Sequence, residues 1–101
     1  MKMKMLPHPT PGETLRQDFM EPLGLKPYGL AKALGVGQTA VGEILAGTRA
    51  ISTEMALRLE AVTGSSAQFW LALQCACDLA VARENPVLKA KIGEIHRLRT
   101  A

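Results

Sequence analysis

The stretch LAKALGVGQTAVGEILAGTR, which begins at Leu30, constrains the fold more than any other part of the chain. Gly35 fits the end of a first short helix, because glycine adopts the left-handed backbone conformation without steric cost. Ala31 is small enough for the crossing point of two steeply inclined helices. Val41 and Ile44 then fall on one buried face of a second helix. This spacing predicts the helix-turn-helix arrangement, in which the second helix is placed to read DNA.

Capping residues and apolar spacing predict that the rest of the chain is also helical. Thr10 suits the N-cap of a first helix that begins at Pro11 and that Pro22 and Gly24 end. Further helices are expected over residues 27–34, 38–46, 53–62, 67–83 and 86–99, with Gly35, Gly47, Ser52, Gly64, Ser66 and Asn85 at their ends. No stretch shows the two-residue alternation of a strand. The predicted fold class is therefore all-α, with about five short helices and an additional C-terminal helix.

The buried faces of the later helices are predicted from the same spacing. On the fourth helix two sets are compatible with burial, either Met55, Leu59 and Val62 or Ala56, Leu57 and Ala61. On the fifth helix the apolar residues at helical spacing are Phe69, Trp70, Leu73, Cys77 and Val81. One interpretation of Trp70 is an exposed side chain that anchors a partner protein. Because the chain has so few aromatic residues, 4% of the total, a place in the core is the preferred interpretation.

Length and composition limit the class of protein. The 101 residues fit one compact domain, and a net charge of +3 permits an anionic partner without requiring one. Pro7 and Pro9 stand where a signal peptide would continue as an apolar stretch. The most apolar run, residues 69–82, is interrupted by Gln74 and Asp78 and is shorter than the roughly 20 residues of a membrane span. We therefore expect a soluble, cytoplasmic protein.

The residues that usually carry catalysis or bind metal are sparse. Cys75 and Cys77 point about 200° apart on a helix, so we interpret them as reduced, packed thiols rather than as a disulfide or a shared metal site. His8 and His96 have no ligand partner nearby in the sequence. No nucleophile–base pair, metal-ligand cluster or glycine-rich phosphate loop is found. We expect no cofactor, no bound metal and no enzymatic activity.

Beyond the helix-turn-helix, longer blocks of the chain resemble a known family. The blocks are HPTPGETLRQDFMEPLGL, LAKALGVGQTAVGEILAGTRAIS, EMALRLEAVTGSSAQFWLALQ and DLAVAR. In this order they resemble the HigA-type antitoxins, also called VapI-like proteins, which carry a lambda-repressor-like (Xre or Cro-type) helix-turn-helix. The resemblance covers residues 8–83, about three quarters of the chain. The combination of the His-Pro and Pro-Gly-Glu leader with the Phe-Trp-Leu helix is more specific than a helix-turn-helix alone.

The resemblance implies a function that composition does not reveal. Proteins of this type are antitoxins of type II toxin–antitoxin pairs and neutralise a toxin, typically an mRNA-cleaving enzyme of the RelE-like or HigB-like class. They also bind their operator DNA as homodimers and repress their own operon. The implied partners are therefore operator DNA, a cognate toxin and a second copy of the chain.

Several residues of the second helix are candidates for contact with bases. In this fold the helix after Gly35 enters the major groove with its N-terminal residues toward the bases. The amide of Gln38 suits adenine, and Glu43 can accept from cytosine or be a solvated acid that repels phosphate. The full set of predicted base-contacting positions is Gln38, Thr39, Ala40, Gly42 and Glu43.

A second set of residues is placed to contact the phosphate backbone. Arg49 follows the end of the recognition helix, where the resemblance implies a basic residue against the phosphate backbone, and an arginine suits a phosphate by its forked geometry. Its alternative is an ion pair with a nearby acid. Lys26 and Tyr28, at the start of the first helix of the motif, and Thr48 complete this set. Ala31, Gly35, Val41 and Ile44 are predicted to be structural.

The recognition helix departs from the family pattern in ways that weaken this prediction. Relatives often carry long or polar residues where this chain has Ala40, Gly42, Ala46 and Thr48, and a capping residue where it has Lys26. Fewer cationic contacts imply weaker DNA binding with a shallower salt dependence. Ala40 or Gly42 can instead allow close approach to a thymine methyl group. The alternatives are an antitoxin that binds only protein, with a degenerate recognition helix, and an orphan Xre-type transcriptional regulator.

The predicted organisation has three parts. Residues 1–9 form a flexible leader, residues 10–84 form the helix-turn-helix domain with its C-terminal extension, and residues 85–101 form the last helix and the tail. By resemblance, the last two helices carry homodimerisation. The final helix either docks on its own subunit or contacts a second copy or the toxin.

Overall fold

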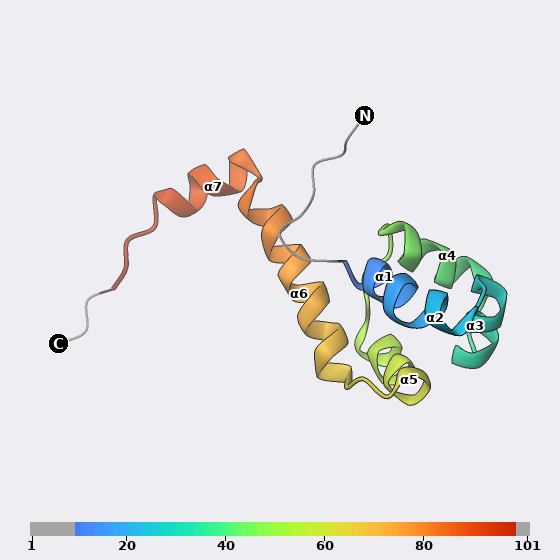
Figure 1. Cartoon of the computed structure of the whole chain (residues 1–101). Coiled ribbons are helices and arrows are strands. Elements are labelled where there is room, and N and C mark those ends of the chain that lie inside the picture. The colour runs from blue at the N-terminus through green and yellow to red at the C-terminus, as the bar shows by residue number, and fades with distance from the viewer. Residues whose placement is uncertain (1–9, 99–101) are drawn as a thin grey trace.

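Six helical segments follow one another in the computed structural model, which describes residues 10–98 (Figure 1). No strand occurs within this described part, so the predicted all-α class is confirmed. The leader predicted over residues 1–9 and the last residue of the predicted final helix, Arg99, lie outside the described residues. No helix in the described range is long and apolar enough to cross a membrane.

The first helical segment begins at the predicted residue and runs through Pro22 to Gly24. It comprises α1 (Pro11–Thr14), the π-helical η1 (Leu15–Met20) and α2 (Glu21–Leu23). Thr10 forms a capping box with Glu13: the Glu13 N–H donates to the Thr10 hydroxyl at 3.0 Å, and the Thr10 N–H donates to the Glu13 carboxylate at 3.1 Å. Both predictions for the start, a Thr10 cap and Pro11 in the first position, are confirmed.

Of the two residues predicted to end this segment, Gly24 is confirmed and Pro22 is wrong, because Pro22 lies inside α2 and Gly24 caps its end. A proline lacks the N–H of a regular helix and its ring crowds the carbonyl one turn earlier. Here the preceding turn is π-helical, with the Glu21 N–H donating to the Arg16 carbonyl five residues back. This wider turn accommodates the proline.

The helix-turn-helix is formed by α3 (Pro27–Leu34) and α4 (Gln38–Ala46), with the bounds predicted from the sequence. Gly35 and Gly47 end the two helices with φ of +74° and +83°. The Val36 N–H donates to the Ala31 carbonyl at 3.0 Å, the long bond of a Schellman motif. The tight turn between α3 and α4 therefore depends on the left-handed backbone at Gly35.

Three further helices follow: α5 (Thr53–Thr63), α6 (Ala67–Arg83) and α7 (Pro86–Gly93). Ser52, Ser66 and Asn85 cap them through side-chain oxygens, as predicted. The prediction that the last helix reaches residue 99 is wrong, because α7 ends at Gly93. All residues of α7 are exposed, and a short helix without tertiary packing does not extend through a glycine.

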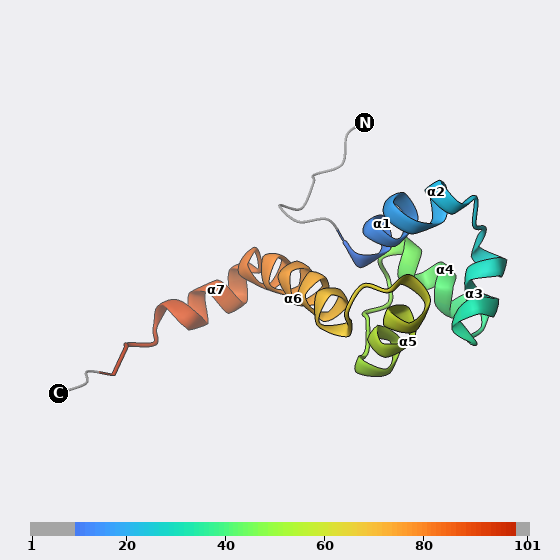
Figure 2. The same cartoon turned by 60° about the horizontal axis from the view of Figure 1, so that its bottom comes forward.

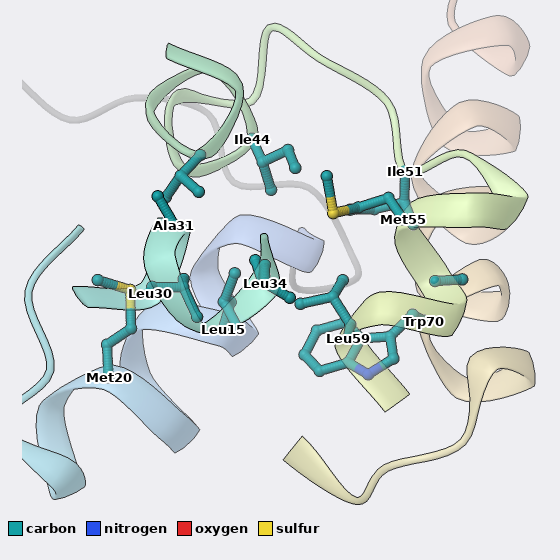
Figure 3. Packing of buried hydrophobic residues seen from close by; sticks show 12 residues of the cluster. Leu15, Met20, Leu30, Ala31, Leu34, Ile44, Ile51, Met55, Leu59 and Trp70 are labelled. Carbon is teal, nitrogen blue, oxygen red and sulfur yellow. The ribbon is translucent and has the colours of Figure 1, made fainter. Parts of the chain in front are cut away.

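The core lies between α1–α5 and the first half of α6. Trp70 is fully buried and stands beside Leu59, with Leu15 and Leu34 next to them (Figure 3). Its indole ring meets Phe19 with ring centroids 5.7 Å apart. The core interpretation of Trp70 is confirmed.

Other burial predictions need correction. On α5 the buried residues are Met55, Ala56 and Leu59, which belong to neither predicted set alone. On α6, Phe69 is exposed although its ring meets that of Trp70 edge to face. Val81 is exposed because the end of α6 extends beyond the helices that could cover it. Figures 1 and 2 both show α6 leaving the group of α1–α5 and α7 continuing outward from it. The part of α6 that follows Cys77 and all of α7 thus form an arm.

Candidate nucleic-acid interface

Helix α4 is anchored in the core by one face and exposes the other. Val41 and Ile44 are 1% and 2% exposed, and they pack against Ala31 and the leucines of α3 and α5. Burial of these apolar side chains holds the helix in place. The structural roles predicted for Ala31, Val41 and Ile44 therefore match their positions in the fold.

The opposite face of α4 carries the predicted base-contacting residues. Gln38 and Thr39 are exposed in the first turn, and Gly42 is exposed in the second. Ala40 and Glu43 are half-buried, so their side chains are less available than those of the first turn. A Cβ at Gly42 would meet no atom within 4 Å, which leaves open space on this face. Only Gln38 and Thr39 therefore present polar side chains in full exposure at the N-terminal end of α4.

A close helix crossing fixes how α4 sits. A Cβ at Gly12 in α1 would overlap with the carbonyl oxygen of Ile44 and would lie 3.0 Å from the Cα of Leu45. The Arg16 guanidinium, on the same segment, donates to the Leu45 carbonyl at 3.3 Å. The first helical segment thus touches the backbone of α4 directly, which glycine alone permits. The sequence reasoning did not identify Gly12 as a contact residue.

Beyond α4, a compact hydrogen-bonded loop carries Arg49. The N–H groups of Thr48 and Arg49 donate to the Glu43 carbonyl at 2.9 and 3.2 Å. The Nε of Arg49 lies 2.8 Å from Glu43 Oε1, and its Nη2 lies 2.8 Å from the same oxygen. Arg49 therefore forms the ion pair that the sequence reasoning considered as its alternative role. Both side chains are about half exposed, at 49% and 43%, so the pair is screened by water and can open.

The start of α3 contributes the other predicted phosphate-contacting residues. Lys26 occupies the N-cap of α3 without a capping side-chain hydrogen bond, and it is exposed. Tyr28 is 62% exposed, and the Lys32 ammonium lies 5.9 Å from the centre of its ring. This distance is within the range of a cation–π contact, which keeps a positive charge beside the tyrosine.

Arg58 of α5 supports the turn of the motif and was missed by sequence reasoning. Its Nη1 donates to the Leu34 carbonyl at 2.8 Å and lies 3.4 Å from the Gly35 carbonyl. Its Nε and Nη2 bind the Glu54 carboxylate at 3.0 and 2.8 Å. A cation at the C-terminus of α3 satisfies its last carbonyls and complements the helix dipole. The only signal in the sequence was the four-residue spacing of Glu54 and Arg58.

Gln74 of α6 was noted in the sequence only as an interruption of an apolar run. Its Oε1 accepts a hydrogen bond of 2.8 Å from the N–H of Ile51, in the loop between α4 and α5. Its Nε2 donates to Asp78 Oδ1 at 2.9 Å. Beside these residues lies a hollow of about 240 Å³ that is also lined by Thr48 and Arg49. The signal available in the sequence was the pair Gln74 and Asp78, which break an apolar run and stand four residues apart on one helix.

The cysteines differ more than the sequence reasoning predicted. Both are thiols rather than partners in a disulfide, but Cys75 is exposed and only Cys77 is packed. Burial raises the pKa of the Cys77 thiol, and the nearby carboxylates of Asp78 and Glu13 raise that pKa further. Cys77 is therefore a neutral thiol at physiological pH, which does not suit a nucleophile or a metal ligand. Within residues 10–98, no group of three or more potential ligands is placed to hold a metal ion.

Comparisons with known proteins agree with this geometry. A family model described as "Helix-turn-helix" matches residues 17–70. The chain is similar to virulence-associated protein I of Dichelobacter nodosus, with 43% identity over 75 residues that cover 74% of this chain and 69% of the relative.

Two solved structures are also similar to the chain. One is the Pseudomonas aeruginosa antitoxin HigA with the higBA promoter, with a TM-score of 0.81 and 38% identity, covering 89% of this chain and 97% of that one. The other is the antitoxin GraA in complex with its operator, with a TM-score of 0.83 and 37% identity, covering 99% of both chains.

Proposed function

The chain belongs to the HigA-type, VapI-like antitoxins of the helix-turn-helix family, and we propose that it binds operator DNA as a homodimer and represses its own operon while neutralising a toxin. The observation that carries the DNA-binding part is the similarity over nearly the whole chain to two antitoxins whose structures contain their promoter or operator. The exposed polar start of α4 supports the same proposal.

The proposed reading surface is small. Gln38 and Thr39 contact bases from the first turn of α4, while Ala40, Gly42 and Glu43 lie close to the groove floor. Lys26, Tyr28, Thr48 and Arg49 contact phosphates from the two ends of the motif. Phosphate contacts supply most of the affinity, and the few polar contacts to bases supply the sequence preference.

The proposed dimer uses the arm formed by α6 and α7. An apolar hollow of about 610 Å³ lies between these helices, and among its lining residues are Leu79, Leu88 and Ile92. These three side chains are 45%, 39% and 55% exposed in the single chain. Exposed apolar surface of this kind marks an interface, and a second copy brings the same surface to a symmetric contact. A dimer also presents two recognition helices to two half-sites, which offsets the few contacts that each one makes.

The proposed toxin is an mRNA-cleaving enzyme of the RelE-like or HigB-like class. The support is membership of the antitoxin family and the similarity to an antitoxin HigA bound to the higBA promoter. The same proposal places the protein in the cytoplasm, where operator and toxin are both found. Residues 10–84 contain the DNA-binding unit, and residues 85–101 act in dimer contact together with Leu79 of α6.

A DNA-binding titration tests the leading proposal. A labelled duplex from upstream of the gene is titrated with the protein at several salt concentrations, and fluorescence anisotropy is recorded beside a scrambled duplex. We expect saturable binding to the upstream sequence, at affinities that fall with salt. Equal affinity for the scrambled duplex, or no binding at low salt, would overturn the repressor function.

One observation favours a second function, that of an antitoxin that binds only protein. Arg49 already holds Glu43, and Ala40, Gly42 and Ala46 present no long polar side chain on α4. This function predicts that toxin rescue in cells survives Gln38→Ala and Arg49→Ala, and that the wild type does not repress its operator. Operator repression by the wild type would exclude it. The remaining alternative is an orphan Xre-type regulator, and a search for a toxin gene beside this one tests that.

A further inference from the structure

We infer that Gln74 of α6 is a positioning residue for DNA binding, because it holds the loop that carries Arg49. This inference rests on the proposed contact between Arg49 and phosphate. It adds a role for a side chain of α6, which lies far along the sequence from the recognition helix.

The loop between α4 and α5 is held at both ends by different elements. Its first part is tied to α4, where the N–H groups of Thr48 and Arg49 share the Glu43 carbonyl. Its last part is tied to α6 through the 2.8 Å hydrogen bond from the Ile51 N–H to Gln74. The side chain of Ile51 is 4% exposed, so the chain enters the core at this point. A backbone N–H entering the core needs an acceptor, and Gln74 supplies it.

The orientation of the Gln74 amide is determined by its two partners. The Ile51 N–H is a donor and requires the amide oxygen, while the Asp78 carboxylate is an acceptor and requires the amide nitrogen at 2.9 Å. Only one orientation satisfies both groups. Asp78 lies one turn further along α6, so it holds the Gln74 side chain in place from its own helix.

The hydrogen bond between Gln74 and the Ile51 N–H holds the loop to α6, because the side chains of the loop and of α6 pack incompletely against each other. The hollow of about 240 Å³ separates Thr48, Arg49 and Ala50 from Gln74 and Asp78. Without the bond to Gln74, the loop has room to shift into this space. Arg49 stands two residues before Ile51, so such a shift moves its backbone relative to α4 and relative to DNA.

The chain offers a matched control for the test. Gln74→Leu removes the acceptor at nearly constant volume, and Gln68→Leu makes the same change at an exposed position of the same helix. Gln74→Glu combined with Asp78→Asn restores an acceptor for Ile51 and keeps a hydrogen bond between the two side chains, with donor and acceptor exchanged. Well-dispersed NMR spectra establish that each variant is folded.

Amide hydrogen exchange, measured without DNA, tests whether Gln74 protects the Ile51 N–H. We expect exchange at the Ile51 N–H to be faster by about tenfold or more in Gln74→Leu than in Gln68→Leu, since the bond protects this group. We expect Gln74→Glu combined with Asp78→Asn to restore slow exchange at the Ile51 N–H. Unchanged exchange at Ile51 in Gln74→Leu would overturn the inference, whatever the DNA-binding result.

DNA binding in a double-mutant cycle tests the functional part. We expect Arg49→Ala to weaken binding about tenfold and to make the slope of log affinity against log salt shallower by about 0.9, as for one lost phosphate contact. We expect Gln74→Leu to weaken binding about threefold with a shallower slope, and to add nothing in the Arg49→Ala background. Gln68→Leu should bind as the wild type does.

Two results would contradict the functional part. One is wild-type affinity in Gln74→Leu while Arg49→Ala is weakened. The other is an equal loss from Gln74→Leu with and without Arg49, because the effect would then not pass through the arginine. A wild-type protein that binds no operator is a different outcome, which overturns the proposed repressor function and with it the role of Gln74 in DNA binding.

Discussion

Arg49 and Glu43 are joined by two nitrogen–oxygen distances of 2.8 Å, so the cation proposed to meet a phosphate is held by an acid of α4 itself. The pair uses Nε and Nη2 of Arg49, so a contact with DNA either uses Nη1 beside the pair or replaces the pair. The pair is partly exposed and is therefore inexpensive to open. Glu43 thus lowers the positive charge of the surface while keeping the arginine in place.

Glu43→Gln tests this relationship. Because the substitution removes a negative charge from the groove side and releases Arg49, we expect tighter binding to scrambled DNA by about three- to tenfold at low salt, with a steeper salt dependence. The stability should change by less than about 1 kcal/mol. Anisotropy titrations over a range of salt measure the first effect. Glu54→Gln, which removes a second exposed carboxylate–arginine pair, is the control, and an equal gain there would indicate a general charge effect.

Gln38→Ala tests base recognition by the first turn of α4. If the amide contacts adenine, we expect a loss of discrimination between operator and scrambled DNA of about 1–3 kcal/mol, with little change in affinity for the scrambled duplex. Competition titrations with both duplexes measure this difference. Gln68→Ala, on an exposed site of α6, should retain full discrimination. Equal discrimination in the two variants would remove Gln38 from the reading surface.

Two glycine-to-alanine substitutions should have opposite effects on stability. Gly12→Ala places a Cβ against the backbone of Ile44 and Leu45, which cannot yield, so we expect a loss of about 1–3 kcal/mol. Gly42→Ala adds a Cβ in open space within a helix, so we expect a gain of about 0.5–1 kcal/mol. Urea unfolding monitored by Trp70 fluorescence measures both. Gly42→Ala also tests close approach to DNA: weaker operator binding in this more stable variant would indicate that the missing side chain is needed.

Charge placed in the hollow between α6 and α7 should prevent dimer formation. We expect Leu79→Glu or Ile92→Glu to shift the protein to monomer, because a carboxylate buried in an apolar contact is strongly unfavourable. Sedimentation equilibrium measures the mass. Leu57→Glu on α5 introduces the same charge at a site that is 54% exposed, compared with 45% at Leu79, and should leave the dimer intact. A wild-type monomer at high concentration would contradict the proposed dimer directly.

The two cysteines should react very differently with a thiol reagent. Exposed Cys75 is modified in the native protein, whereas Cys77 is protected by burial and by its raised pKa. In the unfolded chain a thiol ionises near pKa 8.5, below the raised value in the fold, so the unfolded state loses its proton first as pH rises. The contribution of Cys77 to stability is therefore present below about pH 8.5 and declines above it. Mass spectrometry of Cys75→Ala after timed labelling, from neutral to alkaline pH, measures how fast the Cys77 thiol reacts. Rapid labelling of Cys77 in the native protein at neutral pH would contradict its protection.

Helix positions were predictable because their signals are local. Gly35, Gly47, Ser52 and Ser66 act within one turn of their own helix, so their spacing in the sequence is enough to place the ends of helices. Pro22 misled the prediction because a π-helical turn accommodates it, and such a turn has no clear sequence signal. The last helix was predicted too long because α7 lacks the packing that would carry it past Gly93.

The candidate site was predictable only in part. The exposure of Gln38 and Thr39 follows from the helical period once Val41 and Ile44 are assigned to the core. The hydrogen-bond partners of Arg49, Arg58 and the Ile51 N–H do not follow from the helical period. The sequence analysis kept two roles open for Arg49, and the conformation of the loop after Gly47 decided that it holds Glu43 in the free protein.

The amino-acid sequence alone determined the all-α class and the bounds of α3 and α4, because caps and periodicity are properties of neighbouring residues. It also indicated the antitoxin family, through the resemblance of long blocks of the chain to that family. Tertiary structure alone decided that α1 lies on the backbone of α4 at Gly12, that Gln74 holds the loop at Ile51 and that the arm of α6 and α7 exposes its apolar side chains. These relations join residues that are distant in the chain, and they depend on how whole helices pack. Packing is set by the sum of many weak contacts, which no short stretch of sequence contains.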